Sequence, residues 1–218
     1  MTRFTADRGL VGCGWAQVEE LDPVLPPGYV CNSDVVGVTS SIRAFRCDEC
    51  APLRILAFDI ECISPSGEFP EPDKDGDQVI QISAVLSRLG NETQDRHMFV
   101  LDGCDPLEGV TMHPFAEERD LLSAWREFVL SQDPDIMSGY NSNQFDLPYL
   151  FRRAAHLGIK DFTFQGKVHQ RHVHYRTVFS SAQTGAMAWE RHLIAGRATM
   201  DIYELIRKGK NLRSYKLN

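Results

Sequence analysis

Apolar and polar positions divide the chain into an irregular opening segment, residues 1–52, and a patterned remainder. Leu21–Tyr29 holds three prolines and a glycine, so this stretch is expected to be a loop. Short strands are expected around Val11–Trp15 and Val35–Val38. The opening segment is therefore not expected to form a domain alone.

Leu53–Cys62 (LRILAFDIEC) is almost continuously apolar, a pattern typical of a strand buried on both faces. A loop rich in Pro, Gly and Asp follows it. Two further strands are predicted at Val79–Leu89 and Arg96–Leu101.

Over Glu117–Leu130, the spacing of the apolar residues changes to the period of a helix. Leu121, Leu122, Trp125, Phe128 and Val129 fall on one helical face. The remaining predictions are strands at Asp135–Tyr140 and Ala198–Tyr203, helices at Leu147–Leu157 and Ile202–Lys208, and a long loop or ribbon at Phe162–Gln183. This order predicts a mixed sheet with helices packed on it.

Composition narrows the classes of protein. Apolar residues make up 43% and charged residues 24%, and no apolar run reaches the roughly 18 residues of a membrane span. The N-terminus lacks the apolar stretch of a secretory signal, so an intracellular protein without membrane contact is expected. A net charge of −7 argues against a general DNA-coating protein. It is compatible with a nuclease, whose bound cations offset its carboxylates.

Asp59 and Glu61 lie two apart in the strongest predicted strand, so both side chains share one face of the sheet. Two adjacent acids in an apolar strand repel each other and are costly to bury, and a bridging divalent cation removes the conflict. The alternative is an exposed strand face that carries both acids without a metal.

A second polar group, Asn141–Asp146, joins a predicted strand to a predicted helix. Asp146 is placed as an N-cap, and capping alone could account for it. Capping would not explain the accompanying Gly139, Tyr140 and Phe145, and loops at strand ends commonly carry functional sites.

Together these segments resemble family B DNA polymerases, and within them the delta type. APLRILAFDIEC is similar to the first exonuclease motif, and EERDLLSAWREFVLSQDPDIMSGYNSNQFDLPYLFRRA to the helix and second motif. GRATMDIYELIRKGKNLRSYKLN is similar to the approach to the third motif, and RGLVGCGW to part of the N-terminal domain. The resemblance implies an α/β, RNase H-like (DnaQ-like) exonuclease domain over 53–218, preceded over 1–52 by the end of a β-rich polymerase N-terminal domain.

The resemblance also implies site residues. Three of the four metal-binding acids of the family map to Asp59, Glu61 and Asp146, and second-motif residues that shape the site map to Asn141 and Phe145. Phe69 resembles an aromatic that stacks on a base near the primer end, although it could instead pack on the sheet. Two Mg²⁺ or Mn²⁺ ions are implied, and oxygen ligands suit them.

The implied reaction is two-metal hydrolysis at the single-stranded 3′ end of a primer–template during replication in the nucleus, with accessory subunits and a sliding clamp as partners. The third motif, with its Tyr and fourth Asp, lies beyond Asn218, so the chain alone is expected to be a weak nuclease. Asp201 is not a substitute for that Asp and is expected to be an N-cap.

Other functions stay open. The chain could be a catalytically incompetent module of the same fold that binds nucleic acid or a partner, or a free-standing exonuclease. Cys47 and Cys50 have metal-ligand spacing but no second pair, so reduced thiols are expected. Two candidates remain. One is a histidine run, His169, His172 and His174, and the other is a basic run, Arg207, Lys208, Lys210, Arg213 and Lys216. The first could bind metal and the second phosphates, although solvated loop and helix charge explains both.

Overall fold

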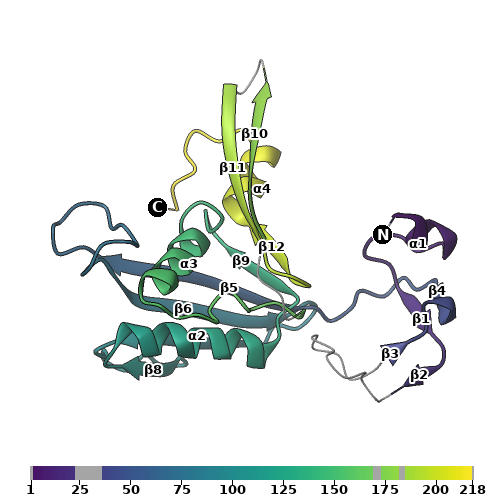
Figure 1. Cartoon of the computed structure of the whole chain (residues 1–218), viewed down its shortest axis with the longest axis horizontal. Helices are drawn as coiled ribbons and strands as arrows, with labels where there is room; N and C mark the ends of the chain where they lie inside the picture. Colours follow the sequence, from purple (N-terminus) through teal and green to yellow (C-terminus); the bar gives the residue numbers. More distant parts are fainter. Residues whose placement is uncertain (1, 23–35, 169–172, 182–184, 218) are drawn as a thin grey trace. The chain divides into compact units, whose positions relative to one another are not determined.

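The computed structural model describes residues 2–22, 36–168, 173–181 and 185–217, and the chain divides into two compact units, Met1–Ala51 and Pro52–Asn218 (Figure 1). Within the described parts, no helix combines the length and apolar character needed to cross a bilayer.

The first unit is built from short elements. They are helix α1 (Thr2–Asp7), strands β1 (Ala16–Val18), β2 (Leu21–Asp22), β3 (Val36–Gly37) and β4 (Ile42–Ala44), and a 3₁₀ turn at Thr39–Ser41. β1 pairs with β4 and β2 with β3, both antiparallel. The strand expected at Val11–Trp15 is wrong, because the first strand begins at Ala16, whereas β3 lies inside the expected Val35–Val38.

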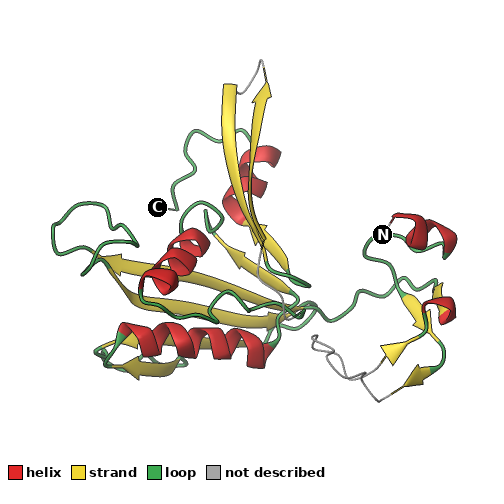
Figure 2. Cartoon of the chain, viewed as in Figure 1, coloured by secondary structure: helices red, strands yellow, loops and turns green. Residues whose placement is uncertain are grey.

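A six-stranded sheet in the order β12-β9-β5-β6-β7-β8 organises the second unit (Figure 2). The strands are β5 (Arg54–Ile63), β6 (Gln78–Arg88), β7 (Gln94–Leu101), β8 (Thr111–Phe115), β9 (Ile136–Gly139) and β12 (Ala198–Asp201). β5, β6 and β7 are antiparallel neighbours, whereas β9 runs parallel to β5, β12 parallel to β9 and β8 parallel to β7. The predicted mixed sheet is confirmed.

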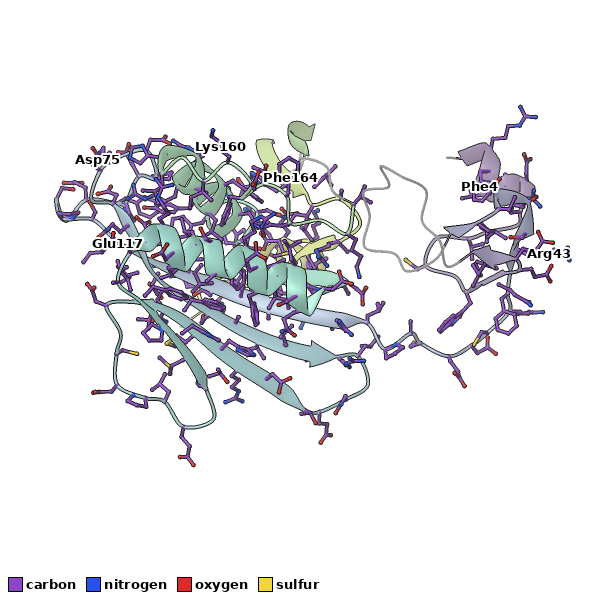
Figure 3. All side chains as sticks on the ribbon, turned by 60° about the horizontal axis from the view of Figure 1, so that its bottom comes forward. Phe4, Arg43, Asp75, Glu117, Lys160 and Phe164 are labelled. Carbon is purple, nitrogen blue, oxygen red and sulfur yellow. The ribbon has the colours of Figure 1, made fainter. Side chains whose placement is uncertain are left out.

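Helix α2 (Glu118–Gln132) packs its apolar stripe on β6, β7 and β8, as the helical period predicted (Figure 3). The Trp125 ring lies 5.5 Å from that of Phe58 and 5.7 Å from that of Phe99, measured between centroids. Helix α3 (Asp146–His156) contacts α2, and helix α4 (Ile202–Gly209) contacts β9 and β12. The core therefore lies between the sheet and the helices.

One prediction for β5 is wrong: the strand is buried on one face only. Leu56, Phe58 and Ile60 are buried, whereas Asp59 and Glu61 alternate with them on an exposed face. The nearly unbroken apolar run concealed this alternation because small or aliphatic residues also occupy exposed strand positions. Both acids thus lie on an open face of the sheet.

The segment expected to be a loop or ribbon contains an antiparallel hairpin, β10 (Val173–Ser181) and β11 (Gly185–Leu193). The hairpin extends away from the sheet (Figure 1). It returns to the sheet through β12, which is followed at once by α4.

A buried ion pair between Arg153 of α3 and Glu118 of α2 fixes the loop that follows β5. The Arg153 Nη2 lies 2.8 Å from Glu118 Oε2, with both side chains only 3% exposed. Arg153 Nη1 also donates to the Lys74 carbonyl at 2.7 Å, and Glu118 Oε1 accepts the Val79 N–H at 2.8 Å. Because each partner has further hydrogen bonds, the pair joins two helices to the loop.

Replacing Arg153 by Ala is expected to lower the free energy of unfolding by about 3–5 kcal/mol, because it leaves a buried carboxylate without its counter-charge. The adjacent Arg152 forms an exposed ion pair with Asp73, so Arg152→Ala is the matched control and should cost at most about 1 kcal/mol. Denaturant titration of both variants measures the difference. Equal losses would contradict the assignment of the buried pair.

Candidate active site

The site begins where β9 stops. β9 pairs with β5 only from Ile55 to Ala57, so beyond that point no strand among the described residues neighbours β5 on this side. There the Ile60 N–H donates to Asp146 Oδ1 at 3.1 Å. A carboxylate from the start of α3 therefore takes the place of a strand partner, as the obligatory pairing of buried backbone donors requires.

Asp146 is the first residue of α3 and does not cap it. The N-cap position belongs to Phe145, which forms no side-chain cap. The predicted N-cap role is thus wrong, and the carboxylate instead reaches the backbone of β5. Asp146 is 2% exposed and therefore buried.

Burial and, second to it, the nearby carboxylate of Asp59 together raise the pKa of Asp146 to about 7. Asp59 also has a raised pKa, chiefly because burial disfavours its charge, while its side-chain hydrogen bond with Asp146 opposes that rise. Two carboxyl groups in hydrogen-bond contact cannot both ionise cheaply. Asp59 and Asp146, called the acid pair below, therefore favour a shared proton in the absence of a cation.

Glu61 lies on the same exposed face of β5 as Asp59. The register of β5 against β6 shifts between Glu61 and Cys62, which is a bulge of the kind that redirects side chains at the ends of strands. Among the described residues, no three His, Cys, Asp or Glu side chains are gathered closely enough to hold a metal ion. The structure brings Asp59 and Asp146 together and leaves Glu61 beside them on the strand.

The loop between β9 and α3 depends on two unusual backbone positions. A Cβ on Gly139 would lie 2.6 Å from the Cβ of Ser142, so only glycine fits there. Asn141 has φ +61°, in the left-handed region that Asn tolerates better than most residues. The predicted role of Asn141 in shaping the site thus has a local basis in the turn.

Asp201, at the end of β12, caps α4 as predicted. Its carboxylate accepts the N–H groups of Tyr203 and Glu204. It also accepts the N–H groups of Asn141 and Asn143, at 2.9 and 3.0 Å. No local sequence pattern indicates these last two bonds, because they join residues about sixty positions apart.

Phe69 lies close to the second-motif aromatic. Its ring meets that of Phe145 edge-on at 5.5 Å, and Phe145 lies 5.6 Å from Tyr149. Phe69 is 72% exposed, so the alternative that it packs on the sheet is not what the structure has. An exposed aromatic face is available beside the loop that leads into Asp146.

A hollow of about 390 Å³ adjoins Asp59 on the open face of the sheet. Its walls come from β5, β6, β9 and the start of α4, and from Tyr140 and Leu217. The Tyr140 hydroxyl donates to the Tyr215 carbonyl, which brings the C-terminal segment to this hollow.

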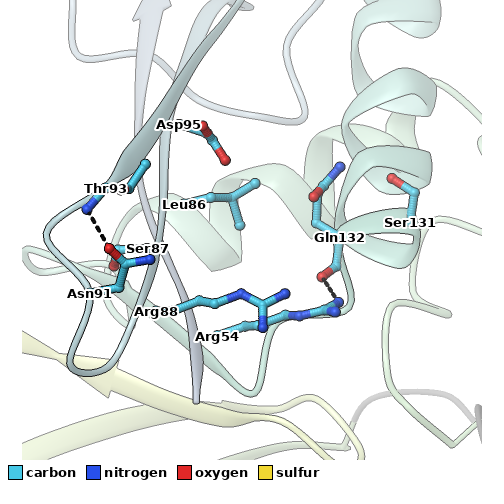
Figure 4. Close-up of a pocket in the computed structure, with 9 residues that line it drawn as sticks. All are labelled: Arg54, Leu86, Ser87, Arg88, Asn91, Thr93, Asp95, Ser131 and Gln132. Carbon is cyan, nitrogen blue, oxygen red and sulfur yellow. Dashed lines mark hydrogen bonds between the residues drawn. The ribbon is translucent and has the colours of Figure 1, made fainter. Parts of the chain in front are cut away.

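Another hollow, of about 370 Å³, lies at the far end of β5 (Figure 4). Arg54 and Arg88, which are cross-strand partners, line it together with Asp95. Arg54 Nη1 donates to the Gln132 carbonyl at 3.0 Å, at the negative end of α2. The two arginines thus lie near an acid and the negative end of a helix. The hollow therefore does not have the uniform positive charge of an anion-binding site.

The other candidates identified from sequence stay outside this site. His169 and His172 lie outside the described residues, and so does the side chain of His174 in β10. Cys47 and Cys50 are free thiols in the first unit. In the basic run, Lys208 pairs with Glu204 and Arg207 lies over the Tyr203 ring, as expected for solvated helix charge.

A family model described as "DNA polymerase family B, exonuclease domain" matches residues 1–218. The chain belongs to the family B DNA polymerases. It is 37% identical to the DNA polymerase delta catalytic subunit of Dictyostelium discoideum and 42% identical to that of Arabidopsis thaliana, in each case over 99% of this chain and 20% of the relative. The chain thus spans about a fifth of these relatives.

A solved family B DNA polymerase from the hyperthermophilic archaeon Pyrobaculum calidifontis superposes with a TM-score of 0.59 and 26% identity. The match covers 95% of this chain and 22% of that one. Together with the mixed sheet and its helices, this likeness confirms the predicted RNase H-like exonuclease fold. The family resemblance inferred from the sequence is also confirmed.

The raised pKa of Asp146 predicts an unusual dependence of stability on pH. The folded protein binds more protons than the unfolded chain between the ordinary Asp pKa of 3.8 and about 7, so this contribution to stability is complete below the first value and is lost as pH rises through the second. Asp146→Asn cannot ionise at this position and so does not lose stability as pH rises. The variant should therefore have a higher free energy of unfolding than the unmodified protein at pH 8, by roughly 2–4 kcal/mol, but not at pH 4.

Denaturant titrations from pH 4 to 8 in a chelator measure this difference, with the exposed Asp105→Asn as control. A constant offset between Asp146→Asn and the unmodified protein across this range would contradict the burial of an ionisable group at this position.

Proposed function

We propose that the chain is the proofreading region of a delta-type DNA polymerase catalytic subunit, which hydrolyses the terminal phosphodiester at DNA 3′ ends. The single observation that carries the proposal is the acid pair, held beside an open hollow and an exposed aromatic ring. Family membership and the delta relatives support the same activity.

Exonuclease domains of this family are generally metal-dependent, and the acid pair fits a divalent cation. The two contacting carboxyl groups have raised pKa values and offer only oxygen donors, which suits Mg²⁺ or Mn²⁺. Asp59, Glu61 and Asp146 would hold the ions. Two such ions lower the pKa of an attacking water and stabilise the leaving 3′ oxygen.

The residues of the chain have separate tasks in this proposal. Ile60 holds the Asp146 carboxylate by its N–H, so the acid is positioned before any cation arrives. Glu61 joins the acid pair by a side-chain rotation from the same strand face. The hollow beside Asp59, which Tyr140 also lines, accepts the terminal nucleotide.

Phe69 and Phe145 would hold the penultimate bases of a frayed single strand. Every base has an aromatic face, so stacking of this kind carries little sequence preference and suits proofreading. The −7 charge of the chain means that backbone contacts elsewhere in a longer polymerase must supply much of the attraction for DNA.

The remaining assignments rest on the relatives. Residues 1–52 would be the end of the polymerase N-terminal domain, and 53–218 the exonuclease domain without its third motif. The partners would be a primer–template, accessory polymerase subunits and a sliding clamp, and the place of action the nucleus.

One observation favours a second function. Glu61 is not gathered with the acid pair, so the chain could serve as a catalytically incompetent module that binds nucleic acid through Phe69 and Phe145. Binding of single-stranded DNA without any excision, in a polymerase chain that contains residues 1–218, would favour this module over the nuclease.

In such a polymerase chain, Asp59→Ala should abolish excision of a mismatched 3′ nucleotide while leaving DNA synthesis intact, because the proposed cation site would lose one of its carboxylates. Excision and primer extension are measured on the same labelled primer–template. Asp105→Ala, at an exposed acid in the loop between β7 and β8, is the control and should retain excision. Undiminished excision by the Asp59 variant would remove it from the proposed role.

Phe69→Ala should weaken the binding of single-stranded DNA by about 1–3 kcal/mol, the usual loss for one stacked base. The effect should appear in KM more than in kcat, because stacking holds the substrate and does not touch the reacting bond. Phe45, which is 51% exposed in the first unit, supplies the control variant Phe45→Ala. An unchanged KM for Phe69→Ala would contradict the stacking role.

A further inference from the structure

The Asp201 carboxylate bonds to two elements at once. Asp201 is the last residue of β12, in register with Gly139 at the end of β9, and is 4% exposed. Its Oδ1 accepts the Tyr203 N–H at 3.0 Å, which caps α4. The same oxygen accepts the Asn141 N–H at 2.9 Å, and Oδ2 accepts the Asn143 N–H at 3.0 Å.

Capping of α4 requires only the first of these bonds. Ser caps helices about as well as Asp, with a single short hydroxyl. The second oxygen of Asp201 contributes nothing to α4 and is used on the loop between β9 and α3. Glu204, one turn into α4, adds a further contact, because its Oε1 accepts the side-chain N–H of Asn143 at 3.2 Å.

The loop that Asp201 holds determines where α3 begins. The Asn141 carbonyl accepts the Phe145 N–H at 3.0 Å, and the Ser142 carbonyl accepts the Leu147 N–H at 2.9 Å. These two bonds enclose Asp146 from both sides. A displacement of the loop would therefore shift Asp146 relative to β5, where its carboxylate accepts the Ile60 N–H.

We infer that Asp201 is a positioning residue for Asp146, and this inference rests on the proposed nuclease function for its catalytic consequence. The residue does not touch substrate or cation. It fixes the backbone of the loop between β9 and α3 from one side, so that the acid pair forms at the free edge of β5.

Two variants of Asp201 separate this role from capping and from charge. Asp201→Ser keeps a cap but is too short to reach the N–H groups of Asn141 and Asn143. Asp201→Asn keeps the cap and one of the two hydrogen bonds to the loop. Its side-chain NH₂ group would face the N–H of the other loop residue and cannot accept a hydrogen bond from it. Both variants remove the same negative charge, so a purely electrostatic effect on Asp146 would be equal in the two.

Amide hydrogen exchange in the 218-residue chain tests the positioning without any metal. The Ile60 amide should exchange at least tenfold faster in Asp201→Ser, and by a smaller factor in Asp201→Asn. The Tyr203 amide should keep its protection in both, which also reports that the variants are folded. Unchanged exchange at Ile60, or equal acceleration in the two variants, would overturn the inference.

Calorimetric titration with Mn²⁺ then measures the consequence for the site. Loss of a residue that orients a ligand commonly weakens metal binding by about 10–100-fold, and Asp201→Ser should fall in this range. If the unmodified chain binds no Mn²⁺ while Ile60 exchange responds as expected, the proposed cation-binding role of the acid pair in this chain fails and the positioning role stands. Mn²⁺ binding that is unchanged in Asp201→Ser, with unchanged Ile60 exchange, overturns the positioning role alone.

Discussion

Contact between the carboxyl groups of Asp59 and Asp146 is the constraint on which the site depends. The contact is costly without a cation, because burial raises the pKa of both groups and the Asp59 carboxylate also raises that of Asp146. It persists because the Ile60 N–H needs an acceptor where β9 stops, and Asp146 supplies one. An acid thus completes the backbone pairing of the sheet and is held ready for a divalent ion.

The surrounding fold maintains this arrangement from three directions. The sheet carries Asp59, α3 begins with Asp146, and the junction of β12 with α4 holds the intervening loop through Asp201. A separate buried ion pair, between Glu118 and Arg153, fixes the loop that presents Phe69. The acid pair and the proposed stacking residue therefore depend on different interactions, and they can be perturbed independently.

Sequence patterns predicted local elements well and long-range contacts poorly. The stripe of Leu121, Trp125 and Phe128 has the period of a helix, so α2 was predictable. Strand β8 was not predicted, and Pro114 within it is tolerated because β8 is an edge strand. The face of β5 was predicted wrongly, since an apolar run does not reveal what covers it.

Spacing singled out Asp59, Glu61 and the Asn141–Asp146 group, and the resemblance to a family assigned their roles, whereas their geometry came only from the structure. The contacts of Asp201 with the loop cross about sixty residues, and no local pattern encodes them. The cap on α4 was predictable because its donors lie two and three residues away. This difference in sequence separation explains which parts of the site could be anticipated.

The central claim is that the acid pair shares a proton until a cation replaces it. Carboxyl carbon chemical shifts of Asp59 and Asp146, followed from pH 3 to 9 by NMR, measure this most directly. Without metal, the pair should titrate with one step near 7, and added Mg²⁺ should move that step to lower pH. Two ordinary Asp titrations below about pH 4.5, unaffected by Mg²⁺, would contradict the account.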